Sequence, residues 1–408
     1  MLVCMNISQL LEFDRLARED GRRYAKRRSL YETIVQDSGA HFTGIVGPRG
    51  VGKTIILKQL ALAHEKSFYI SLDAMEGDLF EIVKTLNDTL RISIFLLDEV
   101  HMYPGFEAVL KKMYDILHIR VIFTSSTALG MYASGHDLSR RVLLMSLYPF
   151  SLREYARFKY AQEFDAVTLQ DIVEKKIPAD VLKAGEYFSS YIQGGLMPFA
   201  LTEPQPMALL GNILKTVIRK DIPRIARLVT DELDKIEQLV RFIGLSGVDG
   251  INYSSAAQNI QITKYKAEQY IALLERAFIL HRIFPAGSNV LKEPKVLMAL
   301  PYRLLYRPLE EAVGGLREDF FVEMLRSLGM EMFYLKSMRG QKTPDYLVRD
   351  DVEIVFEIGG KGKGRSQFKG INVPRKIILS DGYDMTGIRR PLFLAGLLIR
   401  ASQDTHHN

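Results

Sequence analysis

The chain has 408 residues, of which 47% are hydrophobic and 25% are charged, an ordinary composition for a globular protein of two to four domains. Its one cysteine, Cys4, excludes a disulfide scaffold and suits a reducing cytosol. No stretch approaches the roughly 20 apolar residues of a membrane span, and the first residues lack the basic leader of a signal peptide. We therefore expect a cytoplasmic protein with no membrane partner. Its net charge of +6 permits a nucleic-acid partner without requiring one.

The first forty residues show helical periodicity around the densest basic run of the chain, residues 21–28. Apolar residues such as Leu10, Leu16, Leu30 and Ile34 recur at helical spacing. A basic run in such a segment is usually a solvated helix face. Contact with a phosphate backbone is the alternative.

A phosphate-binding loop is predicted between a short buried strand at 41–46 and a helix at 55–61. The loop fits G-x-x-x-x-G-K-[ST] with the residues Gly47, Pro48, Arg49, Gly50, Val51, Gly52, Lys53 and Thr54. Glycines let the backbone N–H groups point at phosphate oxygens beside the positive end of a helix. Lys53 would reach the β- and γ-phosphates and Thr54 would ligate Mg²⁺. The motif predicts binding of ATP and Mg²⁺; a glycine-rich turn that binds nothing is the alternative.

An acidic pair ends the next predicted central strand, the apolar run at 92–97. Asp98 would hold Mg²⁺ through water, and Glu99 would polarise the attacking water as a general base. Such a pair is weak evidence alone. With the P-loop, and with one strand (68–72) and one helix between them, it predicts hydrolysis of the bound nucleotide.

Polar and basic residues flank the last two predicted strands of this segment, at 119–124 and 142–146. Ser125 and Ser126 follow the first of them and would orient the lytic water or sense the γ-phosphate, although a helix N-cap is the alternative. Arg140 and Arg141 precede the second. They would complete a neighbouring subunit's site as an arginine finger, which implies a homo-oligomer. A surface arginine pair with carboxylate partners is the alternative.

This order of strands, polar residues and arginines describes an AAA+ module. The chain further resembles prokaryotic AAA+ ATPases that carry a C-terminal restriction-endonuclease-like domain of unknown function. The resemblance is carried by the P-loop, the segments 97–101, 124–126 and 148–155, Arg141, and the segment 194–198. The expected fold is an α/β P-loop AAA+ parallel sheet with a helical lid, followed by a winged-helix domain and a restriction-endonuclease-like α/β domain. The expected segments are 1–150, 151–230, 231–300 and 301–400, with a flexible tail at 401–408.

Long helices are predicted from residue 151 onward. Ser151 and Glu154 have the spacing of a capping box and start the predicted lid. Gly194 and Gly195 should end a helix there and allow a close approach of the backbone to another element.

A winged helix is predicted at 231–300, with helices at 233–243, 254–260 and 264–280 and a strand pair around residues 285–289. Tyr270, Ile271, Leu274 and Phe278 should form the buried face of the third helix. Its solvent face mixes both charge signs, whereas a DNA-reading helix is usually more one-sided. Duplex reading and a structural or intersubunit role both stay open.

The last hundred residues resemble a PD-(D/E)xK nuclease core. Glu318 lies on a predicted helix, and Asp345 and Glu357 lie on two predicted strands. In that core two carboxylates hold Mg²⁺ and a lysine two residues after the second activates water. Here that position is Gly359, and the first lysine is Lys361, about 7 Å further along a regular strand. The departure favours a degenerate fold kept for binding or assembly over an active nuclease.

A glycine-rich basic loop follows at residues 360–369. Its four cations would bind a phosphate backbone, and a solvated loop is the alternative. The sequence therefore predicts an ATP-driven switch or motor with a C-terminal recognition module. An ATP-regulated, Mg²⁺-dependent nuclease is the second hypothesis.

Overall fold

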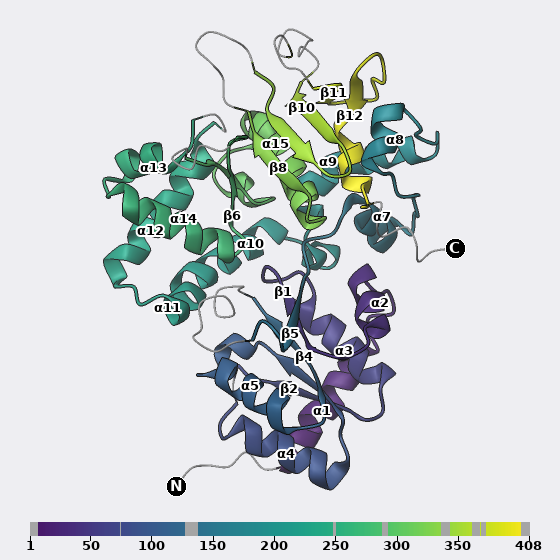
Figure 1. Cartoon of the computed structure of the whole chain (residues 1–408), viewed down its shortest axis with the longest axis vertical. Helices are drawn as coiled ribbons and strands as arrows, with labels where there is room; N and C mark the ends of the chain where they lie inside the picture. Colours follow the sequence, from purple (N-terminus) through teal and green to yellow (C-terminus); the bar gives the residue numbers. More distant parts are fainter. Residues whose placement is uncertain are drawn as a thin grey trace. The chain divides into compact units, whose positions relative to one another are not determined.

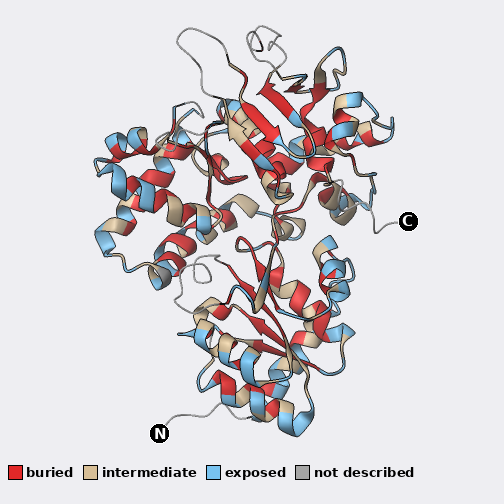
Figure 2. Ribbon diagram, in the orientation of Figure 1, coloured by how far each residue is buried: buried red, intermediate tan, exposed pale blue. Residues whose placement is uncertain are grey.

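The computed structural model describes residues 7–73, 75–126, 138–247, 250–287, 293–335, 343–360, 368 and 373–400. The chain divides into two compact units, Met1–Tyr148 and Pro149–Asn408, each with a five-stranded sheet (Figure 1). Figure 2 shows that buried residues concentrate in the strands and along the inner faces of helices.

The sheet of the N-terminal unit has five parallel strands in the order β2-β3-β4-β1-β5. The strands are β1 (Phe42–Val46), β2 (Ser67–Ser71), β3 (Ile94–Asp98), β4 (Arg120–Ser125) and β5 (Val142–Ser146). This confirms the predicted parallel α/β fold. Because β4 lies between β1 and β3, the carboxyl ends of these three strands meet at one edge of the sheet.

Six helices of this unit are described, and a side-chain cap explains where α4 begins. They are α1 (Ile7–Gly21), α2 (Ser29–Gln36), α3 (Lys53–Ala63), α4 (Leu79–Leu90), η1 (Val100–Met102) and α5 (Phe106–Ile116). The side chain of Asp78 caps α4 by accepting from the N–H groups of Phe80 and Glu81. Apolar residues of α4 and α5 pack on the sheet in one buried cluster.

The basic run is not a helix face, which corrects the expectation from the sequence. Helix α1 ends at Gly21, and residues 22–28 connect it to α2. A Cβ atom at Gly21 would lie 2.8 Å from the carbonyl oxygen of Lys58, so the chain passes close to α3 there. Four cations of the run are exposed, whereas Arg28 is buried.

The C-terminal unit begins with short helices, which corrects the expectation of long helices from the sequence. They are α7 (Leu152–Tyr160), α8 (Leu169–Glu174), η2 (Val181–Ala184), α9 (Gly185–Ser190), η3 (Tyr191–Gly195), η4 (Pro198–Leu201), α10 (Pro206–Thr216), η5 (Val217–Asp221) and α11 (Ile222–Ile225). The predicted capping box of Ser151 and Glu154 is confirmed. Gly194 is left-handed, with φ 119°, and a Cβ at Gly195 would lie 2.7 Å from the ring of Tyr155. Both predicted glycine features are therefore present.

This helical segment packs on the end of the chain within the same unit. The backbone of Val167 forms a parallel bridge with Leu398. The buried guanidinium of Arg390 donates to the carbonyl oxygens of Ile172, at 2.6 Å, and Val173, at 2.8 Å. Two segments that are more than two hundred residues apart in sequence thus share one packed unit.

Three helices and a two-stranded antiparallel sheet follow. They are α12 (Thr230–Leu245), α13 (Tyr253–Ile260), α14 (Lys264–Arg276), β6 (Leu280–Ile283) and β7 (Lys295–Met298). The prediction placed the end of the third helix at Leu280, which is wrong. The helix ends at Arg276 because Phe278 adopts a left-handed conformation, with φ 60°, and Leu280 begins β6.

The second large sheet has the strand order β12-β11-β10-β9-β8. It contains β8 (Glu331–Tyr334), β9 (Tyr346–Arg349), β10 (Glu353–Gly359), β11 (Arg375–Ser380) and β12 (Arg389–Pro391), with η6 (Tyr302–Leu305), α15 (Leu309–Ser327) and η8 (Leu392–Leu397) around it. Strands β8, β9 and β10 pair antiparallel, and β10, β11 and β12 pair parallel. Helix α15 packs on β10, where the rings of Phe321 and Phe356 lie 5.0 Å apart.

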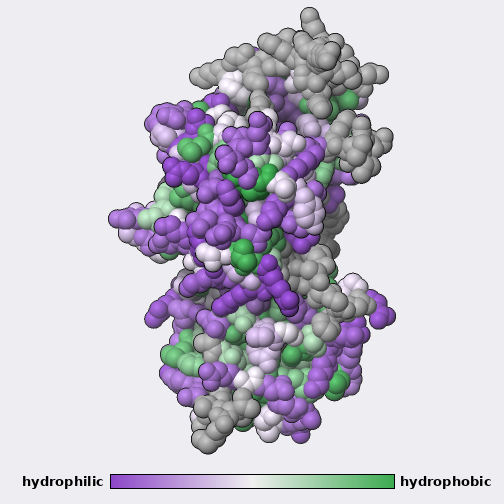
Figure 3. Space-filling view, turned by 90° about the vertical axis from the view of Figure 1, so that its left-hand side faces the viewer, coloured by the Kyte–Doolittle hydropathy of each residue, from purple (hydrophilic) through white to green (hydrophobic). Residues whose placement is uncertain are grey.

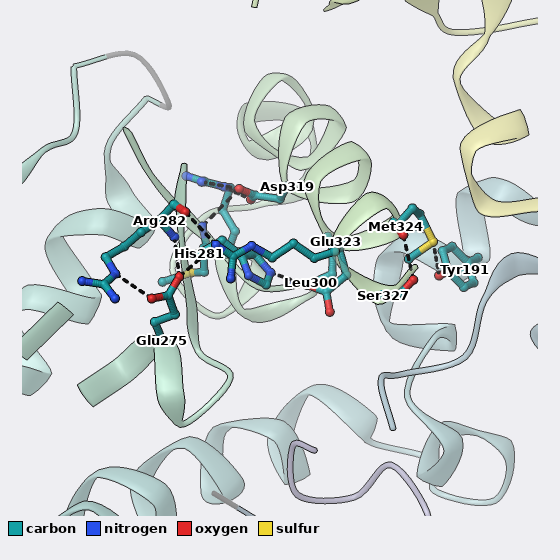
Figure 4. Close-up of polar contacts among 12 residues, drawn as sticks. Tyr191, Glu275, His281, Arg282, Leu300, Asp319, Glu323, Met324 and Ser327 are labelled. Atoms are coloured by element: carbon teal, nitrogen blue, oxygen red, sulfur yellow. Dashed lines mark hydrogen bonds and ion pairs between the residues drawn. The ribbon is translucent and has the colours of Figure 1, made fainter. Parts of the chain in front are cut away.

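Buried polar contacts tie α15 to the preceding segment (Figure 4). Nε2 of His281 on β6 lies 2.7 Å from Oε2 of Glu323, and the guanidinium of Arg303 forms two hydrogen bonds with Asp319. Because a buried charge is costly without a partner, these pairs fix how α15 meets β6 and η6.

Hydrophilic residues dominate the face drawn in Figure 3, with apolar residues in small separate areas. Within the described parts of the chain, we find no helix with the length and apolar character needed to cross a membrane.

Candidate functional site

The P-loop curls between β1 and α3 because its glycines allow conformations closed to other residues. Gly50 and Gly52 are left-handed, with φ 82° and 93°. A Cβ atom at Gly47 would lie 2.0 Å from the carbonyl oxygen of Leu147, while one at Gly52 would meet nothing within 4 Å. The loop is therefore packed closely on one side and open at Gly52, next to the first residue of α3.

The amine of Lys53 lies inside this curl. Its Nζ donates to the carbonyl oxygens of Gly47, at 2.7 Å, and Pro48, at 2.8 Å, and the residue is 5% exposed. Thr54 follows on the first turn of α3 and is half-buried. A cation, a hydroxyl and the N-terminal N–H groups of a helix thus converge at one place.

The buried guanidinium of Arg28 forms a hydrogen bond with the P-loop, a role that was not predicted from the sequence. Its Nη1 donates to the carbonyl oxygens of Val51, at 3.1 Å, and Tyr148, at 2.7 Å. In the sequence, Arg28 is only the last cation of the basic run at residues 21–28. Its burial distinguishes it from the others, and periodicity alone does not reveal burial.

Asp98 is held by two hydroxyl groups at the end of β3. The hydroxyl of Tyr69 donates to Oδ2 at 2.8 Å, and the hydroxyl of Thr124 donates to Oδ1. Burial and the neighbouring Asp98 carboxylate raise the pKa of Tyr69 well above its usual range, so Tyr69 remains a donor. The carboxylate of Asp98 and the hydroxyl of Thr54 are hard oxygen donors of the kind that Mg²⁺ takes, and the chemistry of this donor set fits the ion.

Glu99 sits in an uncommon backbone conformation directly after Asp98, with φ 56° and ψ 47°. Left-handed non-glycine residues are few and often occur at functional sites. Its N–H donates to Oγ1 of Thr124 at 2.9 Å, and its Oε2 lies 3.3 Å from Nε2 of His101.

The end of β4 contacts both the P-loop and the segment that carries Glu99. The N–H of Gly47 donates to the carbonyl oxygen of Ser125 at 3.3 Å. Oγ of Ser126 lies 2.9 Å from Nε2 of His101. The structure therefore brings together the predicted loop, Asp98, Glu99, Ser125 and Ser126, and it adds His101.

The two predicted finger arginines directly precede β5. They lie at the amino-terminal ends of the parallel strands, whereas the P-loop follows the carboxyl end of β1. Arg141 immediately precedes β5, and its carbonyl oxygen accepts the N–H of Phe42 at the start of β1. Its guanidinium makes two hydrogen bonds to Asp115, at 2.8 and 3.0 Å. Arg140 is exposed beside it. The pair with Asp115 supports the structural alternative for Arg141, and the position excludes action on the chain's own P-loop.

The predicted acidic residues of the C-terminal sheet also lie near one another. Tyr346 of β9 stands opposite Phe356 of β10, so the next pair along the ladder is Asp345 and Glu357. Burial, followed by the negative charges of Glu318 and Glu357, raises the pKa of Asp345 to about 7. Oδ2 of Asp345 accepts the N–H of Ile358 at 2.7 Å.

A lysine does reach this cluster, but from an unexpected element. Nζ of Lys295, on β7, donates to Oε2 of Glu318 at 2.6 Å, and the hydroxyl of Tyr346 donates to the same oxygen at 2.6 Å. The predicted Lys361 lies outside the described residues. Among those that are described, no three acidic, histidine or cysteine side chains are arranged to hold a metal ion. The described part of this cluster does not fit a nuclease metal centre.

Two family models match parts of the chain. Residues 40–156 match the AAA domain, and residues 185–299 match a domain of unknown function. Most of the first match lies in the N-terminal unit, and it includes the P-loop and the ends of β3 and β4. The second match crosses the predicted boundary between the lid and the winged helix.

An uncharacterized protein of Methanocaldococcus jannaschii is similar over most of its length. The alignment is 388 residues long and 26% identical. It covers 84% of this chain and 81% of that protein. The similarity thus extends across both units.

Several known structures align over much of the chain, but only loosely. The Thermotoga maritima RuvB Holliday junction branch migration motor is 13% identical, with 68% of this chain and 89% of that chain covered and a TM-score of 0.24. PCH-2 of C. elegans is 14% identical, with coverages of 64% and 67% and a TM-score of 0.24. Scores this low carry no argument about this protein.

Proposed function

We propose that this protein binds and hydrolyses ATP and works as a molecular switch or motor. The observation that carries the proposal is the junction of the P-loop with the ends of β3 and β4. There Lys53, Asp98 and Glu99 occupy one edge of a parallel sheet whose strand order places them together. The match of residues 40–156 to the AAA domain supports the same activity.

The residues of the site take complementary roles in this proposal. The N–H groups of the loop and the amine of Lys53 bind the phosphates. Thr54 and Asp98 would hold Mg²⁺, which when bound neutralises charge on the phosphate oxygens. Glu99 accepts a proton from the attacking water, and Ser125 and Ser126 orient that water beside the γ-phosphate.

Equilibrium binding of ATP with Lys53→Ala tests the phosphate site. The change removes the cation from the loop, so we expect the affinity for ATP to fall at least about 100-fold, the scale of a lost charged contact. Lys66→Ala is the matched control, because Lys66 is an exposed lysine of the same unit. Unchanged affinity in Lys53→Ala would remove the loop from the proposal.

The C-terminal unit is the recognition module in this account. We propose a helical lid at 151–230, a winged helix at 231–300 and a degenerate nuclease-like domain at 301–400. Nucleic acid would contact the winged helix and the basic loop at 360–369, most of which lies outside the described residues. An ATP-regulated nuclease is the alternative, and the engagement of Glu318 by Lys295 and Tyr346 argues against it.

A further inference from the structure

A tyrosine of β2 contacts Asp98, the carboxylate that would hold Mg²⁺ at the end of β3. In the pairing of these two strands, Tyr69 stands beside Leu96 and Ser71 stands beside Asp98. Because side chains alternate between the two faces of a strand, Asp98 lies on the same face as Tyr69, about 7 Å further along. The long side chain of Tyr69 covers this distance, and its hydroxyl donates to Oδ2 of Asp98 at 2.8 Å.

A second hydroxyl holds the other oxygen atom of the same carboxylate. Oγ1 of Thr124 accepts the N–H of Glu99 at 2.9 Å and donates to Oδ1 of Asp98. Asp98, Tyr69 and Thr124 are all buried. The last torsion of an aspartate side chain is broad, so a contact at Oδ1 alone lets the carboxylate pivot. Contacts at both oxygen atoms define its plane.

The main chain of Tyr69 is anchored to α1 and does not depend on Asp98 for its place. Its N–H donates to Oδ1 of Asp14 at 2.8 Å. Oδ2 of Asp14 pairs with Arg18 at 2.7 Å, and Arg18 also donates to the carbonyl oxygen of Ser67 on β2. Since β2 is an edge strand, these contacts hold its outer edge, and the hydroxyl of Tyr69 is presented to Asp98 from a fixed strand.

We propose that Tyr69 is a positioning residue for the nucleotide site, which orients the Asp98 carboxylate toward the metal ion that accompanies ATP. The inference rests on the proposed ATPase activity and deepens it. Groups that donate to a metal-binding carboxylate fix its orientation, and their loss commonly lowers metal affinity or activity about 10- to 100-fold. Tyr69 lies outside the P-loop and outside the acidic pair, so no motif of the sequence marks it.

Binding of the non-hydrolysable ATP analogue AMP-PNP, measured with Mg²⁺ and with EDTA, tests this role. The ratio of the two affinities reports how strongly the complex holds the metal ion, and it requires no turnover. Tyr69→Phe keeps the ring and removes the hydroxyl, so we expect this ratio to fall about tenfold, the lower end of the range for a lost outer partner. The affinity measured with EDTA should change less than about twofold, because Lys53 and the loop still bind the phosphates.

Tyr114→Phe is the matched control. The hydroxyl of Tyr114 donates to the carbonyl oxygen of Ala40 at 3.1 Å, before the amino-terminal end of β1, whereas the P-loop follows the carboxyl end. Its loss should leave the ratio at the wild-type value. A purely structural role for Tyr69 predicts the same of Tyr69→Phe, with a lower midpoint of thermal unfolding as its effect. An unchanged ratio in folded Tyr69→Phe would therefore overturn the proposal.

A double variant tests whether Tyr69 acts through Asp98. In an Asp98→Asn background, Tyr69→Phe should change the ratio less than about twofold, because residues that act through one contact are non-additive. A full effect of Tyr69→Phe in that background would contradict the proposal. If Tyr69→Phe does not fold, Thr124→Val takes its place, since it removes the other hydroxyl from the carboxylate. It should lower the same ratio, and an unchanged ratio would again overturn the proposal.

Failure of this inference differs from failure of the proposed function. A wild-type protein that binds AMP-PNP under neither condition would overturn the proposed ATPase activity. A wild-type protein that binds the analogue more tightly with Mg²⁺, and keeps its ratio in Tyr69→Phe, would overturn the role of Tyr69 alone. Equal wild-type affinities under both conditions would remove the metal ion from the site and the role of Tyr69 with it.

Discussion

At the scale of single residues, the two acidic sites of this chain treat their carboxylates differently. Asp98 is buried and accepts hydrogen bonds from the hydroxyl groups of Tyr69 and Thr124. Asp345 lies beside Glu318 and Glu357, and its pKa rises to about 7. In the second arrangement, burial and the neighbouring carboxylates disfavour the ionised form of Asp345.

The raised pKa of Asp345 makes stability depend on pH in a predictable direction. In an unfolded chain an aspartate has a pKa of about 3.9, so between there and about 7 the folded state binds a proton that the unfolded state lacks. This contribution to stability is complete below the lower pKa and is lost as the pH rises through the upper one.

Asp345→Asn should therefore stabilise the protein relative to wild type, and by more at pH 8 than at pH 5. The difference between the two pH values should be on the order of 2 kcal/mol. Thermal unfolding in the absence of Mg²⁺ at both pH values measures it, with the exposed Asp351→Asn as control. An equal effect at both pH values would show that Asp345 titrates normally.

At the scale of elements, the sequence predicts regular segments well and their exceptions poorly. Apolar periodicity predicts the strands of the N-terminal sheet and the helices α12, α13 and α14. The caps Ser151 and Thr263 mark the starts of α7 and α14. The end of α14 was misplaced because Phe278 is left-handed, and no propensity signals that conformation in a phenylalanine. Lys295 and His101 were missed because their roles depend on contacts between elements.

An added methyl group should change the stability of the protein in opposite directions at Gly47, in the P-loop, and at Gly314, in α15. Gly47→Ala places a Cβ about where the carbonyl of Leu147 lies, so it should destabilise the N-terminal unit by about 1–3 kcal/mol or more and weaken ATP binding. Gly314→Ala, inside α15 with nothing within 4 Å, should stabilise by up to about 1 kcal/mol.

Thermal unfolding of the two glycine variants checks both signs. A Gly47→Ala protein with wild-type stability and affinity would show that the loop can move away from β5. A destabilised Gly314→Ala protein would show that α15 requires a glycine there for a contact outside the described residues.

At the scale of the whole molecule, the two arginines before β5 bear on assembly. Arg140 and Arg141 lie at the edge of the sheet opposite to the P-loop of their own chain, so an arginine finger from this position would act only on a neighbour. We expect turnover per subunit to rise with protein concentration, and Arg140→Ala or Arg141→Ala to remove that rise. An arginine finger contributes on the order of 10³–10⁵ in rate.

Asp115→Asn separates a finger from a structural role for Arg141. Because an exposed ion pair contributes little to stability, its loss should leave the concentration dependence intact if Arg141 acts on a neighbour. Turnover that is independent of concentration and unaffected by either arginine change would contradict assembly through these residues.

The central claim is that Glu99 is the base of an ATP-hydrolysing site, and single-turnover hydrolysis of prebound ATP with Mg²⁺ tests it most directly. Glu99→Gln should keep ATP bound and slow its hydrolysis about 10²- to 10⁴-fold, the usual contribution of a general base. Glu81→Gln, at an exposed glutamate of the same unit, should hydrolyse ATP like wild type. Equal single-turnover rates in wild type and Glu99→Gln would contradict the claim.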